Sequence, residues 1–166
     1  MGRGGCLGTA LLKTMEYSVM KGITTGLMLL LMLAGCGTVP VDSRGWITPA
    51  DAVRAVNESP SQPLRGEFVL TVRAIGSQGE RTFLNSETDY RNQNNLTIAM
   101  RTSTATALEK RLGVALADLK GRRIVVLGEA RRVRIGLFDD RKRPTGKYYF
   151  QTHVPVDSPT QVRFAH

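Results

Sequence analysis

The feature that most constrains the fold of this chain is an apolar pattern with a period of two, which begins near Gly66 and recurs almost to the end. Phe68, Leu70 and Val72 alternate with neighbours that are mostly polar. Successive side chains of a β-strand point to opposite faces, so this alternation predicts a strand with one buried face. The same pattern predicts a mainly β domain with further strands near residues 81–84, 96–101, 124–135, 147–154 and 161–164.

A helical pattern interrupts the strands once. Thr106 and Glu109 have the spacing of a capping box, in which the two side chains bond the first free N–H groups of a helix. Leucines follow at near-helical spacing. We therefore expect a helix that begins at Thr106 and that Gly113 ends early.

A second, shorter helix is expected before the first strand. Thr48 is a suitable capping residue, Pro49 suits the first helical position, and Asp51 can bond back to the cap. A short apolar stripe follows, which such a helix would pack against the domain. We assign residues 48–63 to this helix and a linker, and residues 64–166 to the domain itself.

Apart from the last short strand, the element order is three strands, a helix and two further strands, which is the order of an OB-fold barrel. Three short stretches also resemble bacterial OB-like domains related to nucleic-acid binders: Gly79 after the first turn, Phe83-Leu84-Asn85, and residues 119–126 with Gly128 just beyond. The resemblance implies a small five-stranded OB-like barrel with one helix between its third and fourth strands. A different small antiparallel barrel or sandwich is the alternative.

The N-terminal part of the chain has a different character. Residues 22–35 are almost wholly apolar or small, and Lys21 precedes them. A run of about 14 residues is too short to cross a bilayer as a helix, which takes roughly 20, but it has the length of the apolar region of a signal peptide. The residues before Met20 fit poorly as a basic leader because they include Glu16, so Met20 is our preferred start.

The residues that close this apolar run resemble the lipobox of bacterial lipoproteins: Leu33, Ala34, Gly35 and Cys36. The resemblance implies cleavage before Cys36 and acylation of its thiol. Residues 1–35 would then be the signal peptide, and residues 36–47 the lipidated cysteine and a tether. In proteobacterial lipoproteins, Gly37 in place of an aspartate implies an anchor in the outer membrane that faces the periplasm. An ordinary signal peptide with an incidental cysteine, or a short anchor helix, is the alternative.

Positive charge is concentrated in one segment. The chain has a formal net charge of +9, and ten of its 23 basic residues lie within residues 120–147, together with three acidic residues. Such a segment favours a polyanion, either nucleic acid or anionic headgroups, although a merely solvated surface also explains it. The candidate ligand-binding residues are Arg122, Arg131, Arg132, Arg134, Arg141, Lys142, Arg143, Lys147, Tyr90, Tyr149 and Gln151.

Aromatic rings are a second requirement for binding single strands, because bases stack on them. By alternation, Phe83, Tyr148 and Phe150 belong to the core, whereas Tyr149 faces outward and Tyr90 lies in a polar loop. A structural or rim role is the simpler explanation for each of these two tyrosines.

The sequence contains no recognisable catalytic or metal site, and we expect neither a metal nor a cofactor. It has two histidines, and the adjacent Asp139 and Asp140 point to different sides of an extended chain. The OB fold also carries thermonuclease-type enzymes, but the acidic ligands of that family cannot be matched at Glu87 or Asp89. An exported nuclease is therefore a minor alternative.

Together these features predict a lipoprotein of the outer membrane that faces the periplasm. Its OB-like domain, anchored through Cys36, would be a non-catalytic binding module for an anionic ligand such as nucleic acid. The competing class is a structural or assembly lipoprotein whose barrel binds another envelope protein. Salt separates these hypotheses, because polyanion binding weakens steeply with ionic strength and a mainly apolar interface does not.

Overall fold

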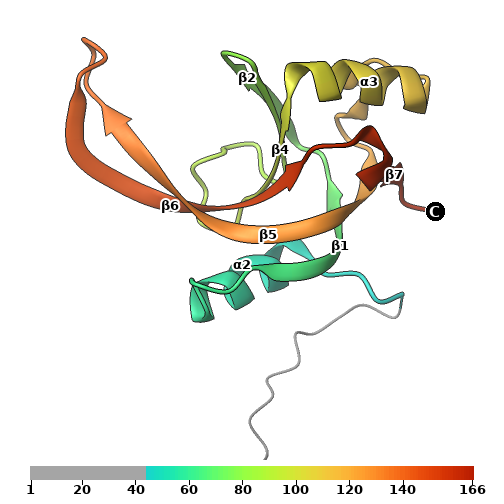
Figure 1. Cartoon of the computed structure of the whole chain (residues 1–166), viewed down its shortest axis with the longest axis horizontal. Coiled ribbons are helices and arrows are strands. Elements are labelled where there is room, and N and C mark those ends of the chain that lie inside the picture. The colour runs from blue at the N-terminus through green and yellow to red at the C-terminus, as the bar shows by residue number, and fades with distance from the viewer. Residues whose placement is uncertain (1–43) are drawn as a thin grey trace, which may run out of the picture. The chain divides into compact units, whose positions relative to one another are not determined.

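The computed structural model describes residues 44–166, and the predicted signal peptide and lipobox lie outside the described residues. In the described part, seven strands accompany two α-helices and two short 3₁₀-helices (Figure 1). The prediction of a mainly β domain is confirmed. The helices are α2 (Pro49–Glu58), α3 (Thr102–Leu112), η1 (Leu116–Leu119) and η2 (Pro159–Gln161). The strands are β1 (Leu64–Thr71), β2 (Ala74–Gln78), β3 (Arg81–Asn85), β4 (Leu96–Arg101), β5 (Arg123–Phe138), β6 (Pro144–Val156) and β7 (Val162–Phe164).

The strands form one mixed sheet whose hydrogen-bonded order is β1-β5-β6-β4-β3-β2, with β7 paired to β5. Every pair is antiparallel except β4 with β6, which is parallel. In this order the sheet is open, and β1 and β2 stand at its two ends. These end strands are consecutive in the chain with only Val72 and Arg73 between them, so the two ends of the sheet lie close together.

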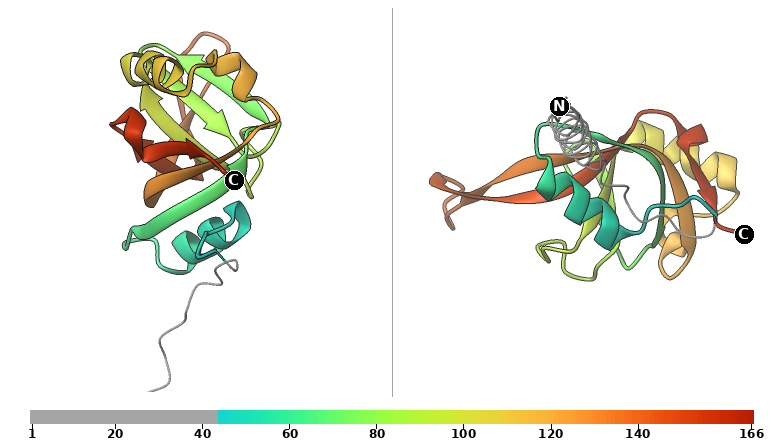
Figure 2. Two further views of the ribbon diagram at one scale, coloured as in Figure 1. Left: turned by 90° about the vertical axis from the view of Figure 1, so that its right-hand side faces the viewer. Right: turned by 90° about the horizontal axis from the view of Figure 1, so that it is seen from below.

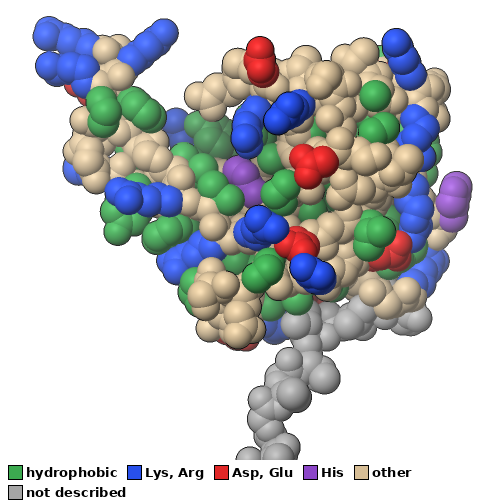
Figure 3. Space-filling view, in the orientation of Figure 1, with side chains coloured by type: hydrophobic (Ala, Val, Ile, Leu, Met, Phe, Trp, Pro, Cys, Tyr) green, Lys and Arg blue, Asp and Glu red, His purple; other side chains and the backbone are tan. Residues whose placement is uncertain are grey.

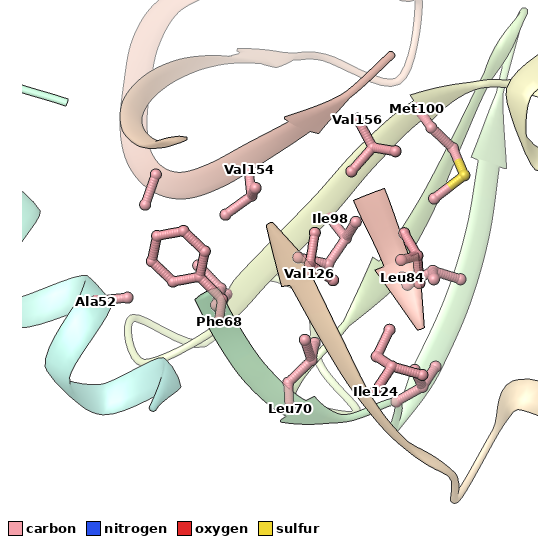
Figure 4. Close-up of a cluster of buried hydrophobic side chains, with 14 of the residues drawn as sticks. Ala52, Phe68, Leu70, Leu84, Ile98, Met100, Ile124, Val126, Val154 and Val156 are labelled. Atoms are coloured by element: carbon pink, nitrogen blue, oxygen red, sulfur yellow. The ribbon is translucent and has the colours of Figure 1, made fainter. Parts of the chain in front are cut away.

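The side chains that the alternation predicts to face inward form the apolar core of the domain. Phe68, Leu70 and Val72 are almost completely buried, together with partners from β3, β4, β5 and β6. Figure 4 shows these side chains converging from several strands, with Ala52 of α2 close to Phe68. Leu108 of α3 is also fully buried in this core. The alternation therefore identified the core face of β1 correctly, but Val69 on the opposite face is also buried, in a small cluster with Trp46 and Val125.

Helix α2 begins with the cap that the sequence predicts. Thr48 Oγ1 accepts a hydrogen bond from the backbone N–H of Asp51, and its hydroxyl donates to the Asp51 carboxylate at 2.7 Å. Pro49 occupies the first turn, and Ala52 and Val56 of the apolar stripe are buried in the core. The cap and the stripe together fix both the start and the packed face of this helix.

Replacement of Thr48 by alanine is expected to lower the free energy of unfolding by about 1 kcal/mol, because the side-chain acceptor of the first helical N–H groups is lost. Replacement by serine keeps that acceptor and should leave the stability nearly unchanged. Urea denaturation of the three proteins measures the difference. An alanine variant as stable as the serine variant would contradict the capping role.

The folded domain begins earlier than the sequence predicts. Trp46 and Ile47, assigned above to the tether, are buried, and Ile47 pairs with Phe68 through a single bridge. The indole N–H of Trp46 donates to the carboxylate of Glu67 at 3.0 Å. A single bridge leaves no repeating pattern in the sequence, which is why alternation does not reveal this short docked segment.

Helix α3 begins at Thr102, so the predicted start at Thr106 is wrong. The Thr106 hydroxyl lies inside the helix and donates to the Thr102 carbonyl. The Glu109 carboxylate does not reach back to the helix start, because it accepts the backbone N–H of Leu116 at the beginning of η1. Gly113 ends α3 as predicted, with a φ of 69° that favours glycine.

The longest strands, β5 and β6, continue beyond the rest of the sheet as a two-stranded arm (Figures 1 and 2). Strand β1 pairs with β5 only as far as Ala130, and β4 pairs with β6 only from Thr152 onward. We call residues 131–151 the arm. Because no further strand among residues 44–166 flanks the arm, Tyr148 and Phe150 are 51% and 41% exposed, and the prediction that they belong to the core is wrong.

Candidate functional site

One face of the arm carries arginine and aromatic side chains in contact. Arg134 of β5 lies opposite Phe150 of β6, and Arg132 and Tyr148 project from the same face two residues away. We call these four side chains the arginine face. The Cζ atom of Arg132 lies 3.6 Å from the ring centroid of Phe150, and that of Arg134 lies 4.1 Å from the centroid of Tyr148. The two rings meet edge to face with their centroids 5.5 Å apart.

This stacking orients both guanidinium groups without neutralising them. Each contact is worth about 0.5–1 kcal/mol at an exposed site, and the N–H donors lie in the guanidinium plane and point away from the ring. Among residues 44–166, neither Arg132 nor Arg134 forms a salt bridge with a carboxylate. Planar cations held in this way suit bidentate hydrogen bonds to phosphate.

The end of the arm adds further positive charge. Asp139 accepts the backbone N–H groups of Arg141 and Arg143 and forms an ion pair with the Arg143 guanidinium at 2.8 Å. These hydrogen bonds, chiefly that from Arg143, lower the pKa of Asp139. In the described part of the chain, Arg141 and Lys142 have no carboxylate within ion-pair distance. Figure 3 shows the Lys and Arg side chains gathered at this end beside apolar ones.

Two of the predicted ligand-binding arginines are placed differently. Arg131 pairs with Glu129, which also pairs with Arg65 at 2.7 Å, and the hydrogen bond from Arg131 is the main cause of the lowered pKa of Glu129. Arg122 precedes β5 at the end away from the arm, with its Cζ atom 5.3 Å from the ring centroid of Phe164. Neither residue is part of the arginine face.

The opposite face of the arm lines a pocket of about 360 Å³. The three uncharged candidates from the sequence, Tyr90, Tyr149 and Gln151, meet there. None of the residues that line it has a formal charge at neutral pH, because burial lowers the pKa of His153 to about 4 and raises that of Tyr149. Its other lining residues are Gly76, Ser77, Gln78, Phe83, Asn85, Thr97, Ile135 and His153.

Gln151 organises one wall of this pocket. Its amide nitrogen donates to the Tyr90 carbonyl at 2.7 Å and to the Tyr149 hydroxyl at 3.1 Å. Since that carbonyl can only accept, the amide oxygen faces the other way, where it lies 2.8 Å from Nε2 of His153. Nε2 therefore carries the proton of the neutral imidazole, and Nδ1 is left as an acceptor.

The floor of the pocket is a row of polar residues across three strands. Asn85 lies opposite Thr97, and Thr97 lies opposite His153. The Asn85 side-chain oxygen accepts from Thr97 Oγ1 at 2.9 Å and from the Asn95 amide at 3.1 Å. All four side chains are buried, so this network also fixes the loop that carries Tyr90.

Sequence reasoning missed Phe83, Asn85, Thr97, Ile135 and His153 as members of one site. The signal that could have placed them is the alternation itself, since Thr97 and His153 are polar positions in predicted strands and Asn85 directly follows one. Alternation does not give strand order or register, however. The row becomes visible only once β3, β4 and β6 are known to be neighbours.

A scan against models of known protein families matched none of them, and a search of curated proteins found no significant match. What can be said about the site therefore rests on its own geometry. That geometry defines a mainly β domain with a basic two-stranded arm, which has stacked arginines on one face and an uncharged pocket on the other.

Within residues 44–166, no three His, Cys, Asp or Glu side chains lie together in a group that could hold a metal ion. No helix of the same range is long and apolar enough to cross a membrane.

Proposed function

We propose that this protein is a lipid-anchored, non-catalytic binding module of the outer membrane that faces the periplasm and holds an anionic polymer, with single-stranded nucleic acid as the best-fitting class. The proposed anchor is the acylated thiol of Cys36, supported by the lipobox-like residues before it. The proposed contacts are the arginine face and the unpaired cations at the end of the arm.

We also propose that the domain is an OB-like barrel in which β1 and β2 act as one bent strand. Backbone hydrogen bonds at the bend support this. The carbonyl of Val72 accepts from Gly121 at 2.7 Å, beside the start of β5, while the N–H of Arg73 donates to Asn85 of β3 at 2.8 Å. Counted in this way, the strands are β1/β2, β3, β4, β5 and β6, with α3 between the third and fourth.

The observation that carries the proposal is the stacking of Arg132 on Phe150 and of Arg134 on Tyr148 at an exposed surface, where neither arginine has an ion pair with a carboxylate of residues 44–166. Proteins that bind single strands combine cations along the backbone path with aromatic rings for the bases. The arginine face offers both, because each guanidinium edge can reach a phosphate and each ring has an exposed part. A surface that is merely solvated would also carry positive charge, but it would not require arginines stacked on aromatic rings.

The test is the salt dependence of binding. Purified full-length protein is titrated with labelled single-stranded DNA and RNA at several salt concentrations. Each phosphate contact contributes a slope of about −0.7 to a plot of log K against log salt, so five unpaired cations predict a slope of about −3.5 and a roughly hundredfold loss between 50 and 200 mM salt. The five are Arg132, Arg134, Arg141, Lys142 and Lys147.

Three results of this titration would overturn the proposal. An absence of binding at low salt, or binding that salt does not weaken, would favour the alternative of a structural or assembly lipoprotein with a protein partner. Cleavage of the strand in the presence of a divalent ion would favour the minor alternative of an exported nuclease.

A further inference from the structure

The pocket beside the arm offers a hydrogen-bond donor and an acceptor that have no partner among residues 44–166. Both lone pairs of the Asn85 side-chain oxygen are engaged, so its amide nitrogen points away from Thr97 and Asn95 and remains an unused donor. At the other end of the same row, Nδ1 of neutral His153 is an unused acceptor. Asn85 and His153 are 6% and 8% exposed, which makes them fixed and buried groups.

The remaining walls are apolar or aromatic. Phe83 meets the His153 ring edge to face with centroids 6.3 Å apart, and Ile135 and Tyr149 project from the arm. Asn85 and His153 stand two strands apart, so their Cα atoms are separated by about 10 Å, and a ring between them can meet both side chains. The volume of about 360 Å³ is within the usual range for small-molecule pockets.

We propose that this pocket binds one neutral heteroaromatic ring of the nucleobase class, by an edge that presents an acceptor to the Asn85 amide and a donor to His153 Nδ1. A phosphate or carboxylate fits poorly, because no lining residue is charged and a buried ion needs a counter-charge. A sugar fits poorly too, because its many hydroxyl groups would meet the apolar walls of Phe83 and Ile135 without partners.

The inference deepens the proposed function, because it assigns a base-binding site to the face of the arm opposite the arginines. It does not depend on the arm's charge. A neutral nucleoside therefore tests the pocket separately from the polymer.

The experiment is calorimetric titration of the full-length protein with adenosine, guanosine, cytidine, uridine and ribose. At least one nucleoside should bind saturably at millimolar concentration, with an affinity that salt does not change, and ribose should not bind. Ile135→Trp fills the pocket and should weaken that binding at least tenfold. Leu127→Trp is the matched control, because Leu127 lies on the same strand, is 56% exposed and is outside the pocket.

A His153→Phe variant keeps a ring against Phe83 but removes the acceptor, and it should also weaken nucleoside binding at least tenfold while urea denaturation shows a folded protein. If no nucleoside binds while the single strand still does, the inference fails and the proposed function stands. If a nucleoside binds but the single strand does not, the proposed function fails and the pocket stands. Equal binding of ribose, or unchanged binding by Ile135→Trp, also overturns the inference.

Discussion

Lowering the pH from 7.5 to 4 is expected to remove about 3 kcal/mol of stability through His153 alone. Burial, and next the nearby charge of Arg81, lower the pKa of His153 from 6.5 to about 4 in the folded protein. Between these two values the unfolded chain binds a proton that the folded protein does not. The stabilisation is therefore complete above pH 6.5 and is lost progressively as the pH falls toward 4. Each pKa unit corresponds to about 1.4 kcal/mol.

The measurement is the free energy of unfolding in urea at intervals between pH 7.5 and 4, for the wild-type protein and for His153→Phe. Carboxylates such as Glu129 and Asp139, whose pKa values are lowered, also reduce stability in acid, but they do so in both proteins. The difference between the two curves isolates the histidine. Parallel curves over this range would show that His153 is not held neutral by the fold.

The proposed binding of a nucleobase in this pocket should depend on pH through the same residue. A protonated His153 has no acceptor at Nδ1, so acid removes the group that would receive a donor from the ligand. It also adds a charge to a pocket whose lining is otherwise uncharged and close to Arg81. Loss of stability and loss of the pocket's acceptor therefore fall in the same pH range.

Local pattern predicts those parts of the fold that depend on neighbours in the chain. The cap at Thr48 and the buried alternation of Phe68, Leu70 and Val72 are of this kind, since each needs only a few consecutive residues. Thr106 and Glu109 have an equally good local pattern, yet the helix starts earlier because Glu109 is engaged with Leu116 instead. A side chain that fits a local capping pattern can thus form its hydrogen bond with a different part of the chain.

Alternation also fails where strands extend beyond their neighbours. It states which side chains share a face but not whether anything covers that face. Tyr148 and Phe150 have the spacing of core residues, but β4 pairs with β6 only from Thr152 onward, and among residues 44–166 no other strand flanks β6 at these rings. The exposure of these rings follows from the unequal lengths of β4 and β6, which no single segment of sequence reveals.

For the site, the sequence identified the charge but not its arrangement. Composition placed the basic residues in one segment, and the ion pair of Arg131 with Glu129 could be foreseen from their spacing on one strand. Glu129 also pairs with Arg65 of β1, and this contact could not be foreseen because it depends on the pairing of β1 with β5. The division of the segment into two faces, with Tyr149 and Gln151 opposite Arg132, depends on the register of β5 with β6.

Reversing two charges on the arginine face is expected to weaken binding of single-stranded DNA at least hundredfold at physiological salt. In an Arg132→Glu/Arg134→Glu variant, two hydrogen-bonded charge contacts are lost, each worth about 1.5–3 kcal/mol, and two repulsive charges replace them. The salt slope should fall in magnitude by about 1.4, because two phosphate contacts disappear. Both ring contacts are lost as well, so the free energy of unfolding should fall by about 1–2 kcal/mol, which urea denaturation measures.

The matched control has the same change in net charge at arginines that already have acidic partners. Arg54 of α2 pairs with Asp51 of the same helix, and Arg65 of β1 pairs with Glu129 of β5. An Arg54→Glu/Arg65→Glu variant therefore alters net charge without touching the arginine face. If binding depends on the stacked arginines, this control should lose only a fewfold in affinity. Equal losses in both variants would mean that net charge, rather than the arginine face, attracts the strand.

An Arg132→Lys/Arg134→Lys variant separates the effect of charge from the effect of side-chain shape. It keeps both cations but loses the planar group that forms bidentate hydrogen bonds, so an intermediate loss of affinity supports the stacked geometry.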